Sequence, residues 1–144
     1  MKILINNKKA LFNYAIEDKY ECGISLWGSE VKSIIKSQAN LDEAFVTFRN
    51  NEAFVLNMHV TPFEHGDVSA NEATRTRKLL LHKTEILRIQ NYVKKNKATV
   101  VPLNIHLANG KIKLTIAIAK RKNASDKRET SKKKDAQREI KKYL

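Results

Sequence analysis

Apolar and polar residues alternate along several stretches of the chain, and a period of two predicts β-strands that each bury one face. The pattern predicts five strands, over residues 20–26, 44–49, 53–60, 99–107 and 111–119. In the first of them, Cys22, Ile24 and Leu26 fall on one side. A cysteine in such a pattern is expected to be a small core residue rather than a nucleophile.

Two-residue turns separate neighbouring strands at two places. Asn50-Asn51 lies between the second and third predicted strands, and Asn109-Gly110 lies between the last two. Asparagine and glycine tolerate the left-handed backbone of a tight turn, and Asn-Gly is a strong hairpin signal. The sequence therefore predicts two β-hairpins.

Helical periodicity occurs in two stretches. Apolar residues at positions 31, 34 and 35 predict a short helix over residues 29–37 that Ser29 caps. A second helix is expected from Thr84 to about Lys95. Its expected inward residues include Leu87, Tyr92 and Val93. The leucines at 79–81 fit a short strand or a helix start, and residues 62–74 lack a period and are expected to form a loop.

These elements predict an α+β domain, mainly β, over residues 1–119. Five or six strands with two or three short helices suit a closed antiparallel barrel, because closure removes exposed strand edges. The oligonucleotide-binding barrel is the natural candidate.

The composition changes after Ala119. Residues 120–144 hold eleven lysines and arginines but only four acidic residues. A segment with so few apolar side chains cannot build a core, so we expect a basic tail that is disordered in isolation. Ala136, Ile140 and Leu144 recur every fourth residue, which predicts a helix that forms only on a partner. A solvated charge run without a specific role is the alternative.

The whole chain is strongly basic, with 28 Lys+Arg against 15 Asp+Glu and a formal net charge of +13. A polyanion relieves the self-repulsion of such a charge, which favours nucleic acid over a membrane surface as the partner. A merely basic protein without such a partner stays open. Nothing resembles a signal peptide or a transmembrane helix, so a cytoplasmic protein is expected.

Enzymatic signatures are weak. No phosphate-binding glycine loop or nucleophile elbow occurs, and the four histidines lack the spacing of a metal site. Glu17, Asp18 and Glu21 lie close in sequence, but acidic residues near a surface strand are far commoner than a two-metal site. We therefore predict no catalytic residue, no metal and no cofactor.

Five sequence blocks, in this order, resemble the small protein B family, also called the SsrA-binding proteins. They are NKKA at residues 7–10, YECG at 20–23, GSEVKS at 28–33, RTRKLLLHK at 75–83 and DKR at 126–128. The resemblance implies an oligonucleotide-binding barrel that grips the tRNA-like domain of transfer-messenger RNA in trans-translation. It also implies a monomer in that complex, a tail that enters the empty mRNA channel of a stalled ribosome and becomes helical there, and no catalytic activity.

The resemblance also implies site residues. Asn7, Glu21, Leu80 and, with a less certain alignment, Lys113 match family positions implicated in RNA contact. Lysine and asparagine suit phosphate and base or ribose contacts, and an exposed leucine offers a surface to a splayed base. For Leu80 a plain core position is an equally good interpretation. A carboxylate such as Glu21 is unusual beside a polyanion unless it accepts from base amino groups or orients an arginine.

Charge alone selects three further candidates for RNA binding, which are Arg75, Arg77 and Lys78. Their alternative is a solvated loop.

In the tail, we assign ribosome binding to Arg121, Lys122, Asp126, Lys127 and Arg128. The chain departs from the family pattern at Ser125, which stands where an aromatic side chain is usual. Base stacking on an aromatic contributes about 1–3 kcal/mol, so that contact is in doubt. The guanidinium plane of Arg121 can stack on that base instead.

Two other functions compete with this interpretation. A different RNA-binding module, such as a ribosomal protein or a single-strand binder, would share the charge, although a single-strand binder needs exposed aromatic platforms. A nuclease would need a metal cluster that the sequence does not suggest.

Overall fold

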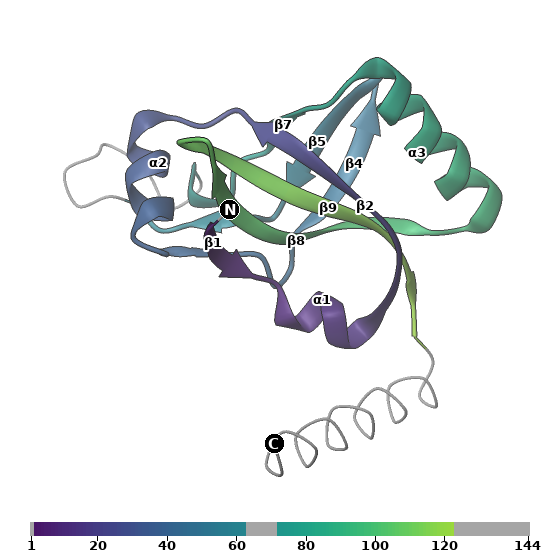
Figure 1. Ribbon diagram of the computed structural model, residues 1–144, viewed down its shortest axis with the longest axis horizontal. Coiled ribbons are helices and arrows are strands. Elements are labelled where there is room, and N and C mark those ends of the chain that lie inside the picture. The colour runs from purple at the N-terminus through teal and green to yellow at the C-terminus, as the bar shows by residue number, and fades with distance from the viewer. Residues whose placement is uncertain (1, 63–71, 123–144) are drawn as a thin grey trace, which may run out of the picture.

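The computed structural model describes residues 2–62 and 72–122. Seven strands form one antiparallel sheet in the order β1-β8-β9-β2-β7-β5-β4 (Figure 1). The strands of this sheet are β1 (Lys2–Asn6), β2 (Tyr14–Ile24), β4 (Phe45–Arg49), β5 (Glu52–Leu56), β7 (Arg77–Leu80), β8 (Thr99–Ala108) and β9 (Lys111–Arg121). The remaining elements are the paired strands β3 (Ala39–Asn40) and β6 (His59–Val60), the helices α1 (Lys8–Asn13), α2 (Gly28–Ile35) and α3 (Lys83–Asn96), and the 3-10 turn Glu72–Thr74.

Both predicted hairpins are confirmed. Asn50 and Asn51 have φ angles of 52° and 61°, and Asn109 and Gly110 have φ angles of 53° and 75°. Each turn has two residues, because Arg49 pairs with Glu52 and Ala108 pairs with Lys111. Left-handed backbone at both turn residues matches the twist of the flanking strands, so these short sequences alone fix the register of two strand pairs.

The sheet is not a closed barrel, and that expectation was wrong. Its end strands are β1 and β4, and no ladder joins them within residues 2–62 and 72–122. The sheet curls so that β4 lies against β8, but without strand pairing. Helices complete the core instead: Ile34 of α2 and Ile86 and Ile89 of α3 join the main apolar cluster.

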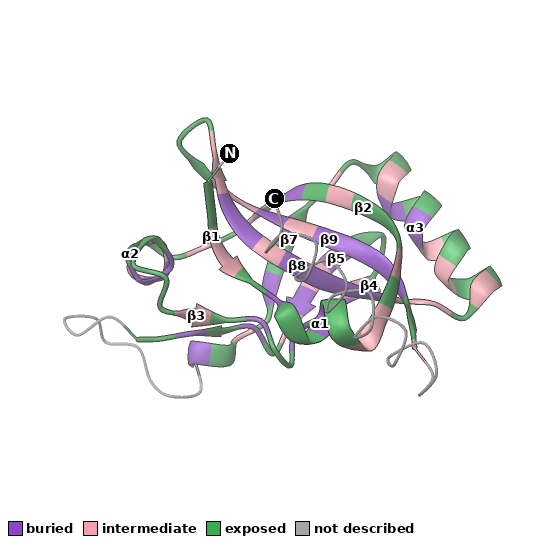
Figure 2. Cartoon of the chain, turned by 60° about the horizontal axis from the view of Figure 1, so that its bottom comes forward, coloured by how far each residue is buried: buried purple, intermediate pink, exposed green. Residues whose placement is uncertain are grey.

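The inward face of α3 differs from the predicted one. Ile86 and Ile89 are buried, whereas Leu87 and Tyr92 are exposed, and only Val93 of the three predicted residues packs against the core. Buried and exposed residues alternate along α3 in Figure 2. The helix begins at Lys83 after His82, not after Thr84. Ile86, Ile89 and Val93 recur at helical spacing and form the face that α3 turns to the core.

The predicted strand over 53–60 is two strands. Asn57 has a left-handed φ of 58° and interrupts the run. Before the break, Ala53 and Val55 are buried, and after it Met58 and Val60 are buried. The buried positions therefore change from odd to even numbers at Asn57. A simple alternation of apolar and polar residues cannot reveal such a change.

The other face of the sheet is only partly covered. Ala10 of α1 packs with Val101, Leu103, Ala117 and Ala119 in a second, smaller apolar cluster. This cluster covers the end of β8 and β9 that lies near the C-terminal end of β9. The opposite end of the same face, next to the β8–β9 turn, has no helix over it in the described residues (Figure 2).

Cys22 lies in the main core, as predicted. Burial raises the pKa of its thiol to about 12, and its Sγ donates to the Leu114 carbonyl oxygen at 3.3 Å. A thiol in this state is a packing group, because the thiolate is the reactive form.

Candidate nucleic-acid interface

A row of side chains crosses five strands on the uncovered part of the sheet. Leu80 pairs with Gly23, Gly23 with Lys113, Lys113 with His106, and His106 with Ile3. Residues directly opposite each other on neighbouring strands project to the same face. We call this area the open face and define it by Ile3, Glu21, Gly23, Lys78, Leu80, Asn104, His106, Lys113 and Thr115.

Glu21 lies near the middle of the open face, and its side chain is 48% exposed. Its Oε2 lies 3.1 Å from Nε2 of His106, and its Oε1 lies 3.4 Å from Nζ of Lys113. The hydrogen bond with His106 is the main reason that the pKa of the Glu21 carboxyl lies below its ordinary value, and Lys113 adds to the effect. The carboxylate is thus held ionised between two basic side chains.

Leu80 is the most exposed large apolar side chain of the open face, at 58%. It lies over Gly23, where an added Cβ would come within 3.2 Å of the Leu80 Cβ. The absence of a side chain at Gly23 therefore allows Leu80 to lie on β2. The leucine-core alternative for this residue is excluded, because Leu79 is the buried neighbour at 1%.

Lys78 lies two residues before Leu80 and projects to the same side of β7. It is half-exposed, and its Nζ lies 3.4 Å from Oε1 of Glu52. An exposed pair at this distance contributes little and is readily exchanged for a phosphate partner. The cationic groups of Lys78 and Lys113 therefore flank the apolar surface of Leu80.

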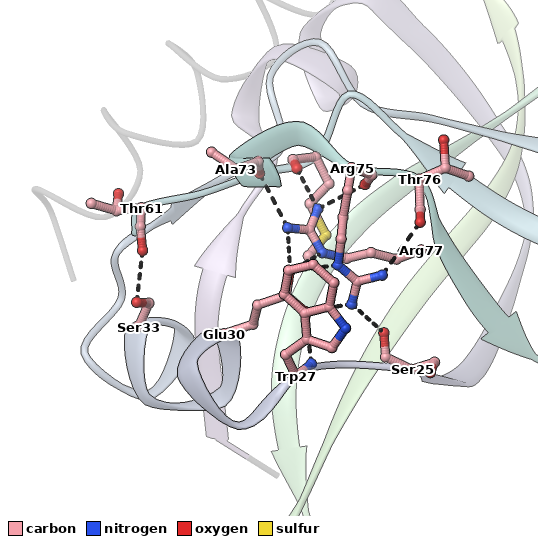
Figure 3. A network of polar contacts seen from close by, with 10 residues as sticks. Ser25, Trp27, Glu30, Ser33, Thr61, Ala73, Arg75, Thr76 and Arg77 are labelled. Carbon is pink, nitrogen blue, oxygen red and sulfur yellow. Dashed lines mark hydrogen bonds and ion pairs between the residues drawn. The ribbon is translucent and has the colours of Figure 1, made fainter. Parts of the chain in front are cut away.

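Arg77 does not belong to this surface. Its side chain is fully buried, and its Nε donates to Oε2 of Glu30 at 2.7 Å (Figure 3). It also donates to the carbonyl oxygens of Met58 at 2.7 Å and Ala73 at 3.1 Å. The prediction of direct phosphate contact by Arg77 was wrong, because β7 alternates and turns this residue inward.

Arg75 belongs to the same network. Its Nη2 donates to Oε1 of Glu30 at 2.6 Å, and its guanidinium lies 4.0 Å from the ring centroid of Trp27 (Figure 3). Its side chain is 22% exposed. Two arginines on one buried carboxylate tie α2 to the start of β7, so the main role of Arg75 in this structure is to hold the fold.

Asn7 is also structural. It is 1% exposed, its Nδ2 donates to the carbonyl oxygens of Leu41 at 3.1 Å and Pro102 at 2.8 Å, and its Oδ1 accepts from the Ala10 N–H at 3.1 Å. The side chain caps α1 and fixes that helix on β8. It is not available for the direct RNA contact that the resemblance implied.

The first tail candidates lie on the folded body. Arg121 pairs with Tyr14, so β9 extends two residues beyond the predicted domain end. The Lys122 N–H donates to the Asn13 carbonyl oxygen at 2.9 Å. Ser125, Asp126, Lys127 and Arg128 lie outside the described residues.

Metal ligands do not gather anywhere in residues 2–62 and 72–122: no three His, Cys, Asp or Glu side chains lie together there. In the same part of the chain, no helix is long and apolar enough to cross a membrane.

Residues 4–144 match the family model described as SmpB protein. The chain belongs to the SmpB family. It is 47% identical to the SsrA-binding protein of Malacoplasma penetrans over 144 residues, which cover 100% of this chain and 99% of that one. It is 52% identical to the SsrA-binding protein of Fusobacterium nucleatum over 139 residues, covering 96% and 94% of the two chains. The resemblance found from the five sequence blocks is confirmed.

The fold is similar to that of a solved SmpB family structure. The chain matches a structure described as "tmRNA-SmpB: a journey to the center of the bacterial ribosome" with a TM-score of 0.69 and 35% identity. The match covers 83% of this chain and 85% of the other.

The sequence did not reveal His106 as part of the open face, nor Glu30 as the buried carboxylate that holds Arg75 and Arg77. The position of His106 was accessible, because counting outward from the two-residue turn at Asn109-Gly110 places it opposite Lys113. Its contact with Glu21 was not, since β2 is far away in sequence. For Glu30, the helical period gave no reason to expect a buried carboxylate with two arginines.

Proposed function

We propose that this chain binds transfer-messenger RNA and acts with it in trans-translation on stalled ribosomes. The observation that carries the proposal is the open face of a chain of the SmpB family. It combines the exposed Leu80, the cationic Lys78 and Lys113, and the clamped carboxylate of Glu21 on one rigid sheet. Its relatives are named SsrA-binding proteins, which supports transfer-messenger RNA as the partner.

Each group of the open face has its own task in this proposal. Lys78 and Lys113 neutralise phosphates, which gives affinity without sequence preference. Leu80 packs against a base that leaves its stack, since single-stranded loops of RNA can splay their bases out. Glu21 accepts hydrogen bonds from a base edge, because a carboxylate can only accept and is repelled by phosphate.

The finer proposal concerns the ribosome and the C-terminal segment. The structural relative is described together with tmRNA and the bacterial ribosome, which supports the ribosome as the second partner and the cytoplasm as the location. We infer that residues 120–144 enter the empty mRNA channel, with Arg121, Lys122, Asp126, Lys127 and Arg128 in contact with ribosomal RNA. The protein acts there as a monomeric, non-catalytic binder.

A gel-shift titration with the tRNA-like domain of transfer-messenger RNA tests the proposal. Leu80→Ala removes an exposed side chain of the open face and should weaken binding by about 1–3 kcal/mol, the range for a base contact. Leu87→Ala is the matched control, because Leu87 is also exposed, at 47%, but lies on α3. The proposal would be overturned if the wild-type chain bound this RNA no better than an unrelated RNA of equal length.

A further inference from the structure

The side chain of His106 is fully buried although β8 points it toward the open face. Its Nδ1 lies 2.8 Å from Oδ1 of Asn104, and its Nε2 lies 3.1 Å from Oε2 of Glu21. The hydroxyl of Thr115 lies 3.5 Å from Nδ1. Both ring nitrogens therefore have oxygen partners, and one of these partners is the carboxylate in the middle of the open face.

The chemistry of the two partners decides which nitrogens carry hydrogen. An ionised carboxylate only accepts, so Nε2 must donate to Glu21. The Asn104 amide can present either its oxygen or its NH₂ group to Nδ1, because these two orientations differ by a rotation of the amide. The ring is therefore hydrogen-bonded on both sides, which fixes its orientation against Glu21.

Glu21 of β2 and Lys113 of β9 both lie beside His106, and the Glu21 carboxylate contacts both of these basic side chains. Ile3 of β1 pairs with His106, and the Thr115 hydroxyl lies close to its Nδ1. The ring therefore occupies a fixed place among four strands of the sheet, and Glu21 is the one group of this cluster with a half-exposed carboxylate.

We propose that His106 is a positioning residue for RNA recognition, which holds the Glu21 carboxylate toward a base edge that bears N–H donors. This inference rests on the proposed function and deepens it. A free glutamate on a strand surface samples several rotamers and repels phosphate. A glutamate fixed by His106 and Lys113 presents its remaining lone pairs in one direction, so less conformational entropy is lost on binding.

The ligand chemistry follows from the acceptor character of Glu21. The base edge must supply amino or imino hydrogens, and guanine offers two adjacent donors of this kind on its Watson–Crick edge. RNA that loses the donor group should therefore lose the contribution of Glu21, while phosphate contacts by Lys78 and Lys113 persist.

Fluorescence anisotropy with the full chain and the tRNA-like domain tests the inference. His106→Gln should weaken binding about tenfold, the effect of one charge-assisted hydrogen bond. Against RNA that lacks the donor group, the wild type and His106→Gln should bind with nearly equal affinity, because Glu21 then has nothing to accept from. His59→Gln, at an exposed histidine of β6, is the control and should keep the wild-type affinity for both RNAs.

A double-mutant cycle separates positioning from a general effect on folding. In a Glu21→Gln background, His106→Gln should have little further effect, because the two residues act through one contact. Asn104→Ala leaves His106 in place but removes the partner that orients its ring through Nδ1, so it should weaken binding in the same direction, and only when Glu21 is present. This second variant keeps the inference testable if His106→Gln does not fold.

The inference would be overturned if His106→Gln kept the affinity of the wild type, or if its effect were equally large without Glu21. Failure of the proposed function has a different signature, in which the wild-type chain does not bind the RNA selectively.

Discussion

Arg77 and Glu30 form an ion pair in the interior of the protein. Nε of Arg77 lies 2.7 Å from Oε2 of Glu30, and the two side chains are 0% and 4% exposed. The guanidinium also donates to the backbone carbonyl oxygens of Met58 and Ala73, so this single side chain connects α2 and β7 with the residue before β6 and with the 3-10 turn Glu72–Thr74. Removal of one partner would leave the other charge buried and unpaired.

We therefore expect Arg77→Ala to lower the free energy of unfolding by about 3–5 kcal/mol, the typical effect of breaking a buried pair. Lys78→Ala is the matched control on the same strand, because its pair with Glu52 is exposed and contributes about 0–1 kcal/mol. Urea unfolding followed by circular dichroism measures both. Equal effects of the two substitutions would show that the buried network does not stabilise the fold.

The same network predicts a response to acid. Burial alone would raise the pKa of the Glu30 carboxyl, but hydrogen bonds from Arg75, the Trp27 backbone and Arg77 outweigh it and lower the pKa. A group with a lowered folded-state pKa stabilises the fold fully above its unfolded pKa, and this contribution is lost as the pH falls through the folded value. The wild type should therefore lose stability below about pH 4.

Glu30→Gln is the variant that isolates this effect. It should have a lower Tm than the wild type at pH 7, and the difference should shrink as the pH is lowered from about 5 to 3, since protonated glutamic acid resembles glutamine. Thermal unfolding across this range measures the difference. A Tm gap that stays constant down to the lowest pH would contradict the assignment of the acid response to Glu30.

The contrast between Arg77 and Lys78 shows what the sequence could reveal. Adjacent basic residues look alike when only charge is counted, and all three cations near residue 75 were assigned to RNA. Recognition of residues 77–80 as a strand would have separated them, because Arg77 and Leu79 then share one face and Lys78 and Leu80 the other. The leucine triplet left strand and helix open, so this separation was not made.

Features that depend on neighbouring residues could be predicted from the sequence, whereas contacts between distant residues could not. The hairpins at residues 50–51 and 109–110 were predictable, because two turn residues determine their geometry. The role of Asn7 was not, because its partners Leu41 and Pro102 are 34 and 95 residues away. Closure of the sheet also depends on tertiary packing, and here helices α2 and α3 complete the core that strand pairing alone would leave open.

Gly23 offers a test of how Leu80 is presented. Gly23→Val would place side-chain atoms where Leu80 now lies, since even a Cβ comes within 3.2 Å of it. Leu80 is exposed and can move, so we expect a stability change within about 1 kcal/mol but weaker binding of the tRNA-like domain. Gly28→Ala is the control, because its Cβ would meet nothing within 4 Å.

The same gel-shift assay, repeated with a chain that already carries Leu80→Ala, shows whether Gly23→Val acts through Leu80. If displacement of Leu80 is the cause, Gly23→Val should have almost no effect on binding once Leu80 is already alanine. An undiminished effect in that background would mean that Gly23 itself approaches the RNA.

The final prediction separates the folded body from the C-terminal segment. The structure places the best truncation point after Lys122 and not after Ala119, where the predicted domain ends. A chain that ends at Ala119 would lose the pairing of Ala15 with Lys120 and of Tyr14 with Arg121, as well as the hydrogen bond from Lys122 to Asn13. A chain that ends at Lys122 keeps all of these contacts. We expect the longer fragment to have the Tm of the full chain and the shorter one to melt several degrees lower, since about 1 kcal/mol shifts the Tm of a domain this size by roughly 2–8 °C.

The longer fragment, residues 1–122, is then the informative variant for function. It retains the open face and should bind the tRNA-like domain with nearly the affinity of the full chain, but it should not support peptide tagging on stalled ribosomes. The reason is that ordering a basic segment costs roughly 1–2 kcal/mol per residue, and only a dense polyanionic channel offers enough compensation.

Triple replacement of Asp126, Lys127 and Arg128 by alanine in the full chain should reduce tagging without changing RNA affinity. Tagging at the wild-type level by residues 1–122 would exclude a channel-binding role for the tail, and loss of RNA binding by this fragment would place the tail in the primary RNA site.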